Sequence, residues 1–285
     1  MKLKALILYY SCSNNTQIVA KETERILKDM NWEISLCKLG SYTKSKKYFD
    51  PDLIILGVPV HYWEIPDAAV EMIHNLSRFT DTAGFVFSTF GKCVCNSVPY
   101  NLAKALQAKG VTILGGAQIL MPHSARMNEN VRIGDVEETF GKGEPTEENQ
   151  LKYKAVVHDL AKRVGGGNIV ELDIDKLKKL HTRNHFAEIM NKFMTTEMRR
   201  SSMPFVQYTK DKCIQCKKCI NKCDYGAISI TDDKEFILNK ERCKKCYKCI
   251  EECNEKALYT KWNQVIFWTR FIHSFSKNTE TIFVI

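Results

Sequence analysis

Eight of the twelve cysteines in this 285-residue chain lie between residues 213 and 253. They form two copies of the pattern C-x2-C-x2-C-x3-C, at 213–223 and 243–253, so the repeat has a period of thirty residues. Apolar residues recur in the same register, with Ile220 matched by Ile250. Because the thiols are concentrated in one small segment, we expect this segment to bind a metal cofactor rather than to form disulfides.

The spacing of the cysteines favours iron–sulfur clusters over zinc. Three cysteines within seven residues can occupy three corners of one cubane, while the fourth, expected at the start of a short helix, points to the other cluster. Structural zinc sites usually take their ligands as two separated pairs, which fits this pattern poorly. We therefore expect two [4Fe–4S] clusters with crossed ligation. The first set is Cys213, Cys216, Cys219 and Cys253, and the second set is Cys243, Cys246, Cys249 and Cys223.

Residues 205–260, which contain this repeat, resemble the bacterial ferredoxin domain with two [4Fe–4S] clusters, which has a small α+β fold. One position departs from the family in each half. The usual proline after the fourth cysteine is Asp224 in the first half and Asn254 in the second. Both residues can cap a helix start, so we expect the geometry to be kept. A carboxylate near one cluster should favour the oxidised form of that cluster.

The first 167 residues alternate between short apolar runs and segments with helical spacing. The runs are rich in Leu, Ile, Val and Phe, which is typical of parallel strands covered on both faces. We expect strands at 4–10, 32–39, 53–60, 84–90 and 111–119. We expect helices at 16–30, 67–76, 98–109 and 147–164. This order predicts an α/β fold with a doubly wound parallel sheet of five strands.

In a doubly wound sheet, the ligand binds at the carboxyl ends of the strands. The first predicted strand ends in a turn of hydroxyl and amide side chains that leads directly into a helix. The backbone N–H groups of such a turn can hold a phosphate group without a Lys or Arg. The alternative is that Ser13 or Asn14 only caps the helix. The turn consists of Ser11, Cys12, Ser13, Asn14, Asn15 and Thr16.

Two further predicted strand ends place aromatic residues beside polar backbone at the same edge. Such residues can stack on a flat isoalloxazine ring and bond its nitrogens. A lone loop histidine such as His61 is usually just solvated or hydrogen-bonded, so we assign it no chemistry. The two segments contain Pro59, Val60, His61, Tyr62 and Trp63, and Thr89, Phe90 and Gly91.

Residues 1–167 resemble the flavodoxin family. The turn at 11–16 is similar to its phosphate loop, and segments 59–66 and 88–96 are similar to its two ring loops. Asn14 stands where the family commonly has Gly, and Asn tolerates the left-handed conformation better than most residues. The resemblance implies a bound FMN. The alternative is a flavodoxin-like shell that has lost its flavin.

The remaining segments complete a four-part organisation. Residues 168–204 are expected to be a helical linker, with helical spacing at 177–198 that packs one domain against the other. The insertion at 121–150 is expected to be a lid or a docking surface over the flavin edge, and the alternative is a disordered segment. The aromatic tail at 261–285 would be buried against a domain, or would form an interfacial helix in peripheral contact with a membrane. We expect Cys93 and Cys95 to be reduced thiols.

The charge distribution leaves two interpretations open. Residues 1–167 hold 20 basic against 18 acidic residues, and residues 168–285 hold 22 against 15. A basic half is typical of binding to nucleic acid or to a membrane surface, but it also offsets the negative charge of thiolate-bound clusters and a flavin phosphate. We expect no nucleic acid partner. The lack of a signal peptide or a long apolar stretch predicts a cytoplasmic protein without a transmembrane segment.

A flavin handles one or two electrons and a four-iron cluster handles one, so together they predict an electron-transfer protein. The resemblance implies low-potential traffic of the kind found in anaerobes, with redox proteins as donor and acceptor. We expect Lys217, Lys218, Lys244 and Lys245 to dock the two domains near the aromatic segments. One alternative is an iron–sulfur flavoprotein reductase acting on a small molecule. Another is a nucleic-acid or membrane-surface binding protein with structural clusters.

Overall fold

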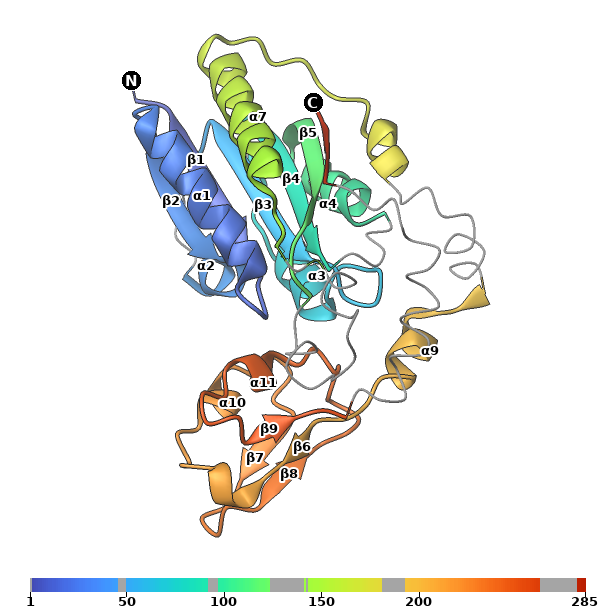
Figure 1. The fold of residues 1–285 in the computed structure, drawn as a ribbon. Helices are drawn as coiled ribbons and strands as arrows, with labels where there is room; N and C mark the ends of the chain where they lie inside the picture. The colour runs from blue at the N-terminus through green and yellow to red at the C-terminus, as the bar shows by residue number, and fades with distance from the viewer. Residues whose placement is uncertain are drawn as a thin grey trace.

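The computed structural model describes residues 2–45, 50–91, 97–123, 141, 143–180, 193–261 and 281–285. These form an α/β domain and a smaller cysteine-rich domain at residues 205–260, which lies below the sheet in Figure 1. None of the helices in these ranges is long and apolar enough to cross a membrane. Cys93, Cys95, most of the 121–150 insertion and residues 262–280 of the tail lie outside the described residues.

The α/β domain is built on a six-stranded sheet with the order β10-β5-β4-β3-β1-β2 (Figure 1). Strands β1 to β5 are parallel. Their order, 2-1-3-4-5, is that of the flavodoxin-like doubly wound fold. The predicted five-stranded parallel arrangement is thus confirmed. The strands are β1 (Lys4–Tyr9), β2 (Glu33–Lys38), β3 (Leu53–Pro59), β4 (Thr82–Phe90), β5 (Val111–Leu120) and β10 (Ile282–Val284).

One edge of the sheet differs from the prediction. Strand β10 pairs antiparallel with β5, so the sheet has six strands and not five. Three residues carry too little periodicity to be recognised as a strand, and their pairing depends on a long-range contact. The strand attaches the end of the tail to the α/β domain, and its three residues are partly buried.

Helices cover both faces of the sheet, as in a doubly wound fold (Figure 1). Four of them match the predicted segments closely. The short helix α2 was not predicted, because its seven residues offer little periodicity. The helices are α1 (Asn15–Asp29), α2 (Leu39–Ser45), α3 (Asp67–His74), α4 (Val98–Gln107) and α7 (Glu147–Gly165).

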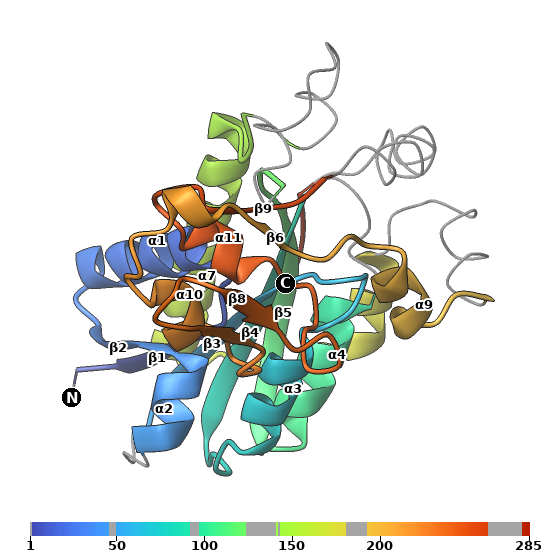
Figure 2. The ribbon, with the colours of Figure 1, turned by 90° about the horizontal axis from the view of Figure 1, so that it is seen from below.

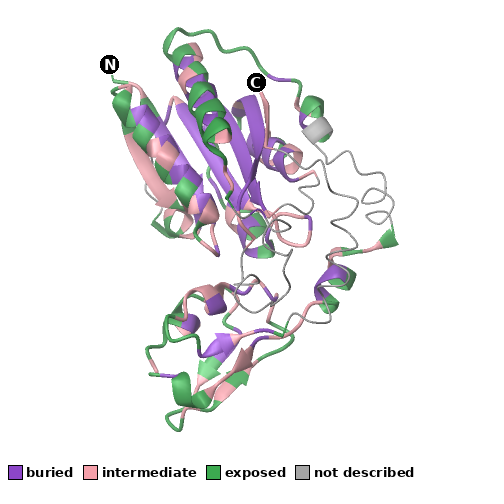
Figure 3. Ribbon diagram, viewed as in Figure 1, coloured by how far each residue is buried: buried purple, intermediate pink, exposed green. Residues whose placement is uncertain are grey.

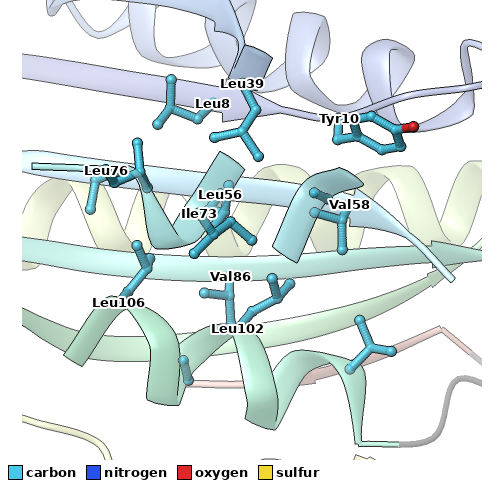
Figure 4. Close-up of a cluster of buried hydrophobic side chains, with 14 of the residues drawn as sticks. Leu8, Tyr10, Leu39, Leu56, Val58, Ile73, Leu76, Val86, Leu102 and Leu106 are labelled. Atoms are coloured by element: carbon cyan, nitrogen blue, oxygen red, sulfur yellow. The ribbon is translucent and has the colours of Figure 1, made fainter. Parts of the chain in front are cut away.

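Two hydrophobic cores lie on opposite faces of the sheet. Successive residues of β1 alternate between them, since Leu6 and Leu8 enter one core and Ala5 and Ile7 enter the other. Helices α1 and α7 cover the second core, and α3 and α4 cover the first, part of which is drawn in Figure 4. Figure 3 shows the central strands buried along most of their length. This rigid sheet holds its carboxyl edge, with the predicted turn, in a fixed place.

The cysteine-rich domain repeats its backbone as well as its sequence. Lys217 and Tyr247 both have positive φ angles, of 58° and 57°, immediately before the equivalent helices α10 (Lys218–Asn221) and α11 (Lys248–Glu251). Two small antiparallel sheets complete the domain. Their strands are β6 (Gln207–Tyr208) with β9 (Leu258–Tyr259), and β7 (Ile228–Ile230) with β8 (Phe236–Leu238).

The predicted position of the fourth cysteine was wrong. Cys223 and Cys253 follow the short helices instead of starting one, and Asp224 and Asn254 lie in turns and cap no helix. It is the third cysteine of each pattern, such as Cys219, that lies inside a helix. Polar residues in turns and at helix starts share the same local hydrogen bonding, so sequence alone does not distinguish the two.

The linker is only partly helical. A short 3₁₀ helix spans Ile174–Leu180, and α9 spans Thr196–Ser201. Residues 181–192 of the predicted helix lie outside the described residues. Leu177 is buried in the core beside α4, as expected for a segment that packs against the first domain.

The packing of β3 against β4 yields a stability prediction. A Cβ atom added at Gly57 would lie 2.0 Å from the ring of Phe87, so Gly57→Ala should lower the free energy of unfolding by about 1–3 kcal/mol. Chemical denaturation measures this loss. As a control, Gly165→Ala at the end of α7 meets only the flexible side chain of Leu3 and should change stability by less than about 0.5 kcal/mol. Equal stability of the two variants would contradict the packing described here.

Candidate functional site

The predicted phosphate turn lies between β1 and α1, at the carboxyl edge of the sheet. Asn14 precedes α1 with φ 67°, so it adopts the left-handed conformation that its place in the turn was expected to require. Its side chain makes no capping hydrogen bond, and the first turn of α1 contains no acidic residue. The alternative that Asn14 only caps the helix is therefore not supported. The N-terminal end of α1 carries the positive end of a fifteen-residue helix dipole.

The hydroxyl groups of the turn differ in their hydrogen bonding. The Oγ atom of Ser11 is buried and has no hydrogen-bond partner among the residues that the structure describes. The hydroxyls of Thr16 and Thr89 bond each other at 2.8 Å, and the amide of Asn15 donates to the carbonyl of Pro122. An unpaired buried polar atom costs about 1–3 kcal/mol. The Ser11 hydroxyl is therefore suited to a polar ligand in this turn.

The first aromatic segment is a tight hairpin after β3. The backbone groups of His61 and Glu64 bond each other in both directions, and the residues between them, Tyr62 and Trp63, have φ angles of 52° and 69°. Positive φ is uncommon for aromatic residues, and such strain persists only where surrounding contacts hold it. These contacts come from the linker and the cysteine-rich domain.

The aromatic side chains contact other parts of the chain. Trp63 is only 8% exposed and lies beneath the guanidinium of Arg199. The hydroxyl of Tyr62 donates to the carbonyl of Lys245 at 2.6 Å, and Phe90 is buried in the core of the α/β domain. Stacking of these rings on a flavin stays a prediction.

The other predicted ring-loop residues lie at the adjoining ends of β3 and β4. Pro59 is in register with Thr89, and the amide of Val60 donates to the carbonyl of Thr89. A Cβ atom at Gly91 would lie 2.8 Å from His123, so only glycine fits there. Burial and the nearby His123 lower the pKa of His61 to about 4, so this imidazole is neutral at neutral pH.

The structure brings together the four cysteines of the first predicted set. Cys213, Cys216, Cys219 and Cys253 line one cavity, so the fourth residue comes from the other half of the repeat. Burial and the neighbouring thiols of Cys253 and Cys216 raise the pKa of Cys219 to about 11. Ligation of a cluster by this set stays a prediction.

The second set is arranged in the same crossed way. Burial, followed by the nearby thiols of Cys246 and Cys223, raises the pKa of Cys243. Within the described ranges, no three Cys, His or carboxylate groups converge on a single metal ion. A cubane needs a wider arrangement, because each of its four cysteines binds a different iron.

The second cysteine loop rests on the phosphate turn. Cys12 is 5% exposed and belongs to the apolar cluster against which Cys246 also packs. Interaction between the two thiols raises the pKa of Cys12 and lowers the pKa of Cys246. In Figure 2, which views the molecule from below, the cysteine-rich domain lies across the end of the sheet.

Contacts on both sides of Cys246 fix this arrangement. The hydroxyl of Tyr10 donates to Asp224 at 2.7 Å, and Lys248 bonds the same carboxylate oxygen at 2.9 Å. On the other side, the hydroxyl of Tyr62 donates a hydrogen bond to the carbonyl of Lys245. Asp224 thus stands where the ferredoxin family has proline and forms part of the contact between the domains.

The prediction that lysines of both halves of the repeat dock the domains is correct for the second half only. The amino group of Lys245 donates to the carbonyls of Arg200, Ser201 and Met203 at the end of α9, and its residue is 6% exposed. Lys244 lies 3.8 Å from Asp67 of α3.

Lys217 and Lys218, in contrast, are exposed and line the cavity of the first cysteine set, so their predicted docking role was wrong.

Sequence reasoning missed most of this interface, although a signal was present. The two halves of the repeat agree at the cysteines but differ at several positions that contact the α/β domain or the linker. The interface residues and their counterparts in the other half are Asp224 and Asn254, Tyr225 and Glu255, Lys245 and Gln215, and Tyr247 and Lys217. Departures from the repeat therefore mark the docking face.

Comparison with known families assigns the cysteine-rich domain. Residues 212–258 match the family model described as the 4Fe-4S dicluster domain. This segment is a 4Fe–4S ferredoxin-type domain. The chain therefore joins an α/β domain with the flavodoxin-like strand order to a 4Fe–4S ferredoxin-type domain. Comparison with curated proteins gives no match.

Solved structures similar to this chain cover its α/β domain. A flavodoxin from the domain Archaea is 16% identical over 57% of this chain and 99% of its own, with a TM-score of 0.40. Oxidised flavodoxin 2 from Bacillus cereus is 19% identical over 56% of this chain and 99% of its own, with a TM-score of 0.42. Rubredoxin oxygen:oxidoreductase from the anaerobe Desulfovibrio gigas is 16% identical over 59% of this chain and 38% of its own, with a TM-score of 0.43.

The contact between the domains can be tested at Tyr10. Tyr10→Phe removes one hydrogen bond to a carboxylate, worth about 1.5 kcal/mol, so the docked contact should open about tenfold more often. This opening is measured as the rate at which a thiol reagent alkylates Cys12, followed by peptide mass spectrometry. The alkylation rate of Cys37 should not change.

Tyr208→Phe is the matched control, because its hydroxyl bonds the carbonyl of Lys234 within the 4Fe–4S domain. An equal rise in Cys12 alkylation in both variants would contradict the docking described here.

Proposed function

We propose that this protein transfers electrons between two [4Fe–4S] clusters and an FMN held at the phosphate turn. One observation carries the proposal: the cysteine-rich domain docks beside the turn that would hold the flavin phosphate, where the hydroxyl of Tyr10 donates to Asp224 and the hydroxyl of Tyr62 donates to the carbonyl of Lys245. The two predicted cofactor sites therefore adjoin, and electron transfer between cofactors needs such proximity. A bound flavin would supply one- or two-electron chemistry beside the one-electron chemistry of the clusters.

The turn offers neutral donors for a phosphate. The buried Ser11 hydroxyl, the Thr16 hydroxyl and the backbone N–H groups at the start of α1 would bind the phosphate oxygens. The neutral imidazole of His61 adds no charge at this edge. These residues fit an FMN phosphate without a cation, as the sequence predicts.

The two cysteine sets would have different roles. The second set faces the α/β domain, so the cluster it would hold is the one next to the flavin. The first set includes Cys216, which is exposed beside Lys217 and Lys218. Electrons would therefore be exchanged with partner proteins at the first set. Redox proteins with an acidic surface suit these lysines as donor or acceptor.

The phosphate turn predicts that flavin affinity depends on neutral donors. Ser11→Ala removes a hydrogen bond to a charged group, worth about 1.5–3 kcal/mol, so the FMN dissociation constant should rise at least tenfold. Flavin fluorescence titration measures it, with Ser35→Ala in β2 as the control. An unchanged constant for Ser11→Ala would place the phosphate elsewhere.

The crossed cysteine sets predict which cluster each variant damages. Cys223→Ala should damage the cluster of the second loop, and Cys253→Ala the cluster of the first loop. Paramagnetic resonance of the reduced variants distinguishes the two signals. If each variant instead damages the cluster of its own half of the repeat, the ligation is not crossed.

Transfer within one molecule is the direct test of the function. When the loaded protein is mixed rapidly and anaerobically with a one-electron donor, bleaching of the clusters should precede or accompany flavin reduction. The observed rate of flavin reduction should not depend on protein concentration, because the two sites are docked in one chain. A rate proportional to protein concentration would show transfer between separate molecules and would contradict the proposal.

The repeat supplies matched variants for this experiment. Lys245→Gln with Tyr247→Lys places first-half residues at the interface and keeps all eight cysteines, so flavin reduction should slow. The reverse change, Gln215→Lys with Lys217→Tyr, lies away from the interface and should leave the rate of flavin reduction unchanged.

A further inference from the structure

Helix α9 of the linker contacts both domains and lies beside their junction in Figure 1. Toward the α/β domain, Arg200 bonds both carboxylate oxygens of Asp67, at 3.0 and 3.1 Å. Toward the 4Fe–4S domain, the carbonyls of Arg200 and Ser201 accept hydrogen bonds from the amino group of Lys245. Arg200 and Lys245 are both buried. The helix therefore connects the two domains through contacts that water does not reach.

The aromatic hairpin at 61–64 is held from both sides of this junction. The Nε atom of Arg199 donates to the carbonyl of Tyr62 at 2.9 Å, and its guanidinium lies 4.7 Å from the centre of the Trp63 ring. From the 4Fe–4S domain, the carbonyl of Lys245 accepts a bond from the Tyr62 hydroxyl at 2.6 Å. Tyr62 and Trp63 have positive φ angles, which bulky residues keep only where surrounding contacts hold them. The conformation of the hairpin therefore depends on α9 and on the docked domain.

Tyr62 and Trp63 belong to a segment that is predicted to contact the flavin ring. Stacking on a flat ring is tighter when the aromatic side chains are already in place, because ordering them during binding costs affinity. A hairpin held by docking would therefore bind the ring more tightly than the hairpin of an undocked chain. By thermodynamic linkage, a bound flavin then favours the docked state by the same factor.

We propose that docking of the 4Fe–4S domain and binding of the flavin ring are coupled through the aromatic hairpin, with Arg199 as the positioning residue. This inference rests on the proposed function, because it requires FMN at the turn. The docked chain would hold its flavin tightly, and an undocked chain would hold it weakly. The flavin would thus be retained in the arrangement that places it next to the second cysteine set.

Tyr62→Phe separates this coupling from stacking, because it keeps the ring and removes only the bond to Lys245. In the full-length protein loaded with clusters, the FMN dissociation constant, measured by flavin fluorescence titration, should rise about fivefold. Tyr208→Phe is the matched control. Its hydroxyl also bonds a carbonyl, but within the 4Fe–4S domain, so the constant should not change. If Tyr62 acts by stacking alone, Tyr62→Phe will leave the constant unchanged as well.

The role of Arg199 is tested with two substitutions. Arg199→Gln removes the cation from Trp63 and should raise the FMN dissociation constant about tenfold, whereas Arg199→Lys keeps a cation there and should recover part of the affinity. At saturating FMN, the visible circular dichroism of the bound flavin should change in Arg199→Gln. It should not change in Ser11→Ala, because that variant alters the phosphate site and not the surroundings of the ring.

The reciprocal effect can be measured on the native protein by amide hydrogen exchange. The amides of Arg199, Ser202 and Met203 are hydrogen-bonded within α9 and the turn that follows it. Saturating FMN should slow their exchange about fivefold or more, because it favours the docked state. The amides of β7 and β8, which pair with each other in the 4Fe–4S domain, should exchange at an unchanged rate.

The possible results separate this inference from the proposed function. If the native protein binds FMN but Tyr62→Phe leaves the dissociation constant unchanged, or FMN does not slow exchange in α9, the coupling is wrong and the proposed function stands. If Arg199→Gln does not fold, those two measurements still decide between coupling and independence. If the native protein binds no FMN, the proposed function fails and the inference fails with it.

Discussion

The docking of the Cys246 loop on the turn after β1 determines how the two domains of this chain can work together. It is held by polar contacts, since Asp224 accepts a hydrogen bond from the hydroxyl of Tyr10 and the carbonyl of Lys245 accepts one from the hydroxyl of Tyr62. Cys12 and Cys246 pack in the same apolar cluster within this frame. Without these contacts, a flavodoxin-like domain and a 4Fe–4S domain would be two separate carriers on one chain.

The asymmetry of an internally repeated domain explains how one cysteine set comes to face the sheet. The two loops share their cysteine spacing and their left-handed residues, as Lys217 and Tyr247 show. Only the second loop carries the side chains that fit the α/β domain. The repeat thus provides two similar sites, and a few substitutions assign the second to the contact with the α/β domain, whereas Cys216 of the first is exposed. This division suits a protein that exchanges electrons with partners at one end and with a flavin at the other.

Much of the fold follows from the sequence, because it depends on local patterns. Apolar runs and helical spacing locate the parallel strands and four helices within a few residues, and the hydroxyl-rich turn with Asn14 in a left-handed conformation lies where expected. Strand β10 and the place of Asp224 were missed, because both depend on contacts between residues far apart in the chain. The aromatic hairpin shows the same limit. Its sequence suggests stacking on a flat ring, but the hydroxyl of Tyr62 is hydrogen-bonded to a carbonyl of the 4Fe–4S domain.

The central claim is that the cluster of the second cysteine set adjoins the flavin site. The most direct test is a crystal structure of the protein purified anaerobically with its cofactors. The account predicts that the cluster bound by Cys243, Cys246, Cys249 and Cys223 lies next to the turn at 11–16, with the flavin phosphate bound in that turn and the other cluster farther away. A structure in which the first cluster lies nearer to the flavin, or in which the domains do not touch at this turn, would contradict it.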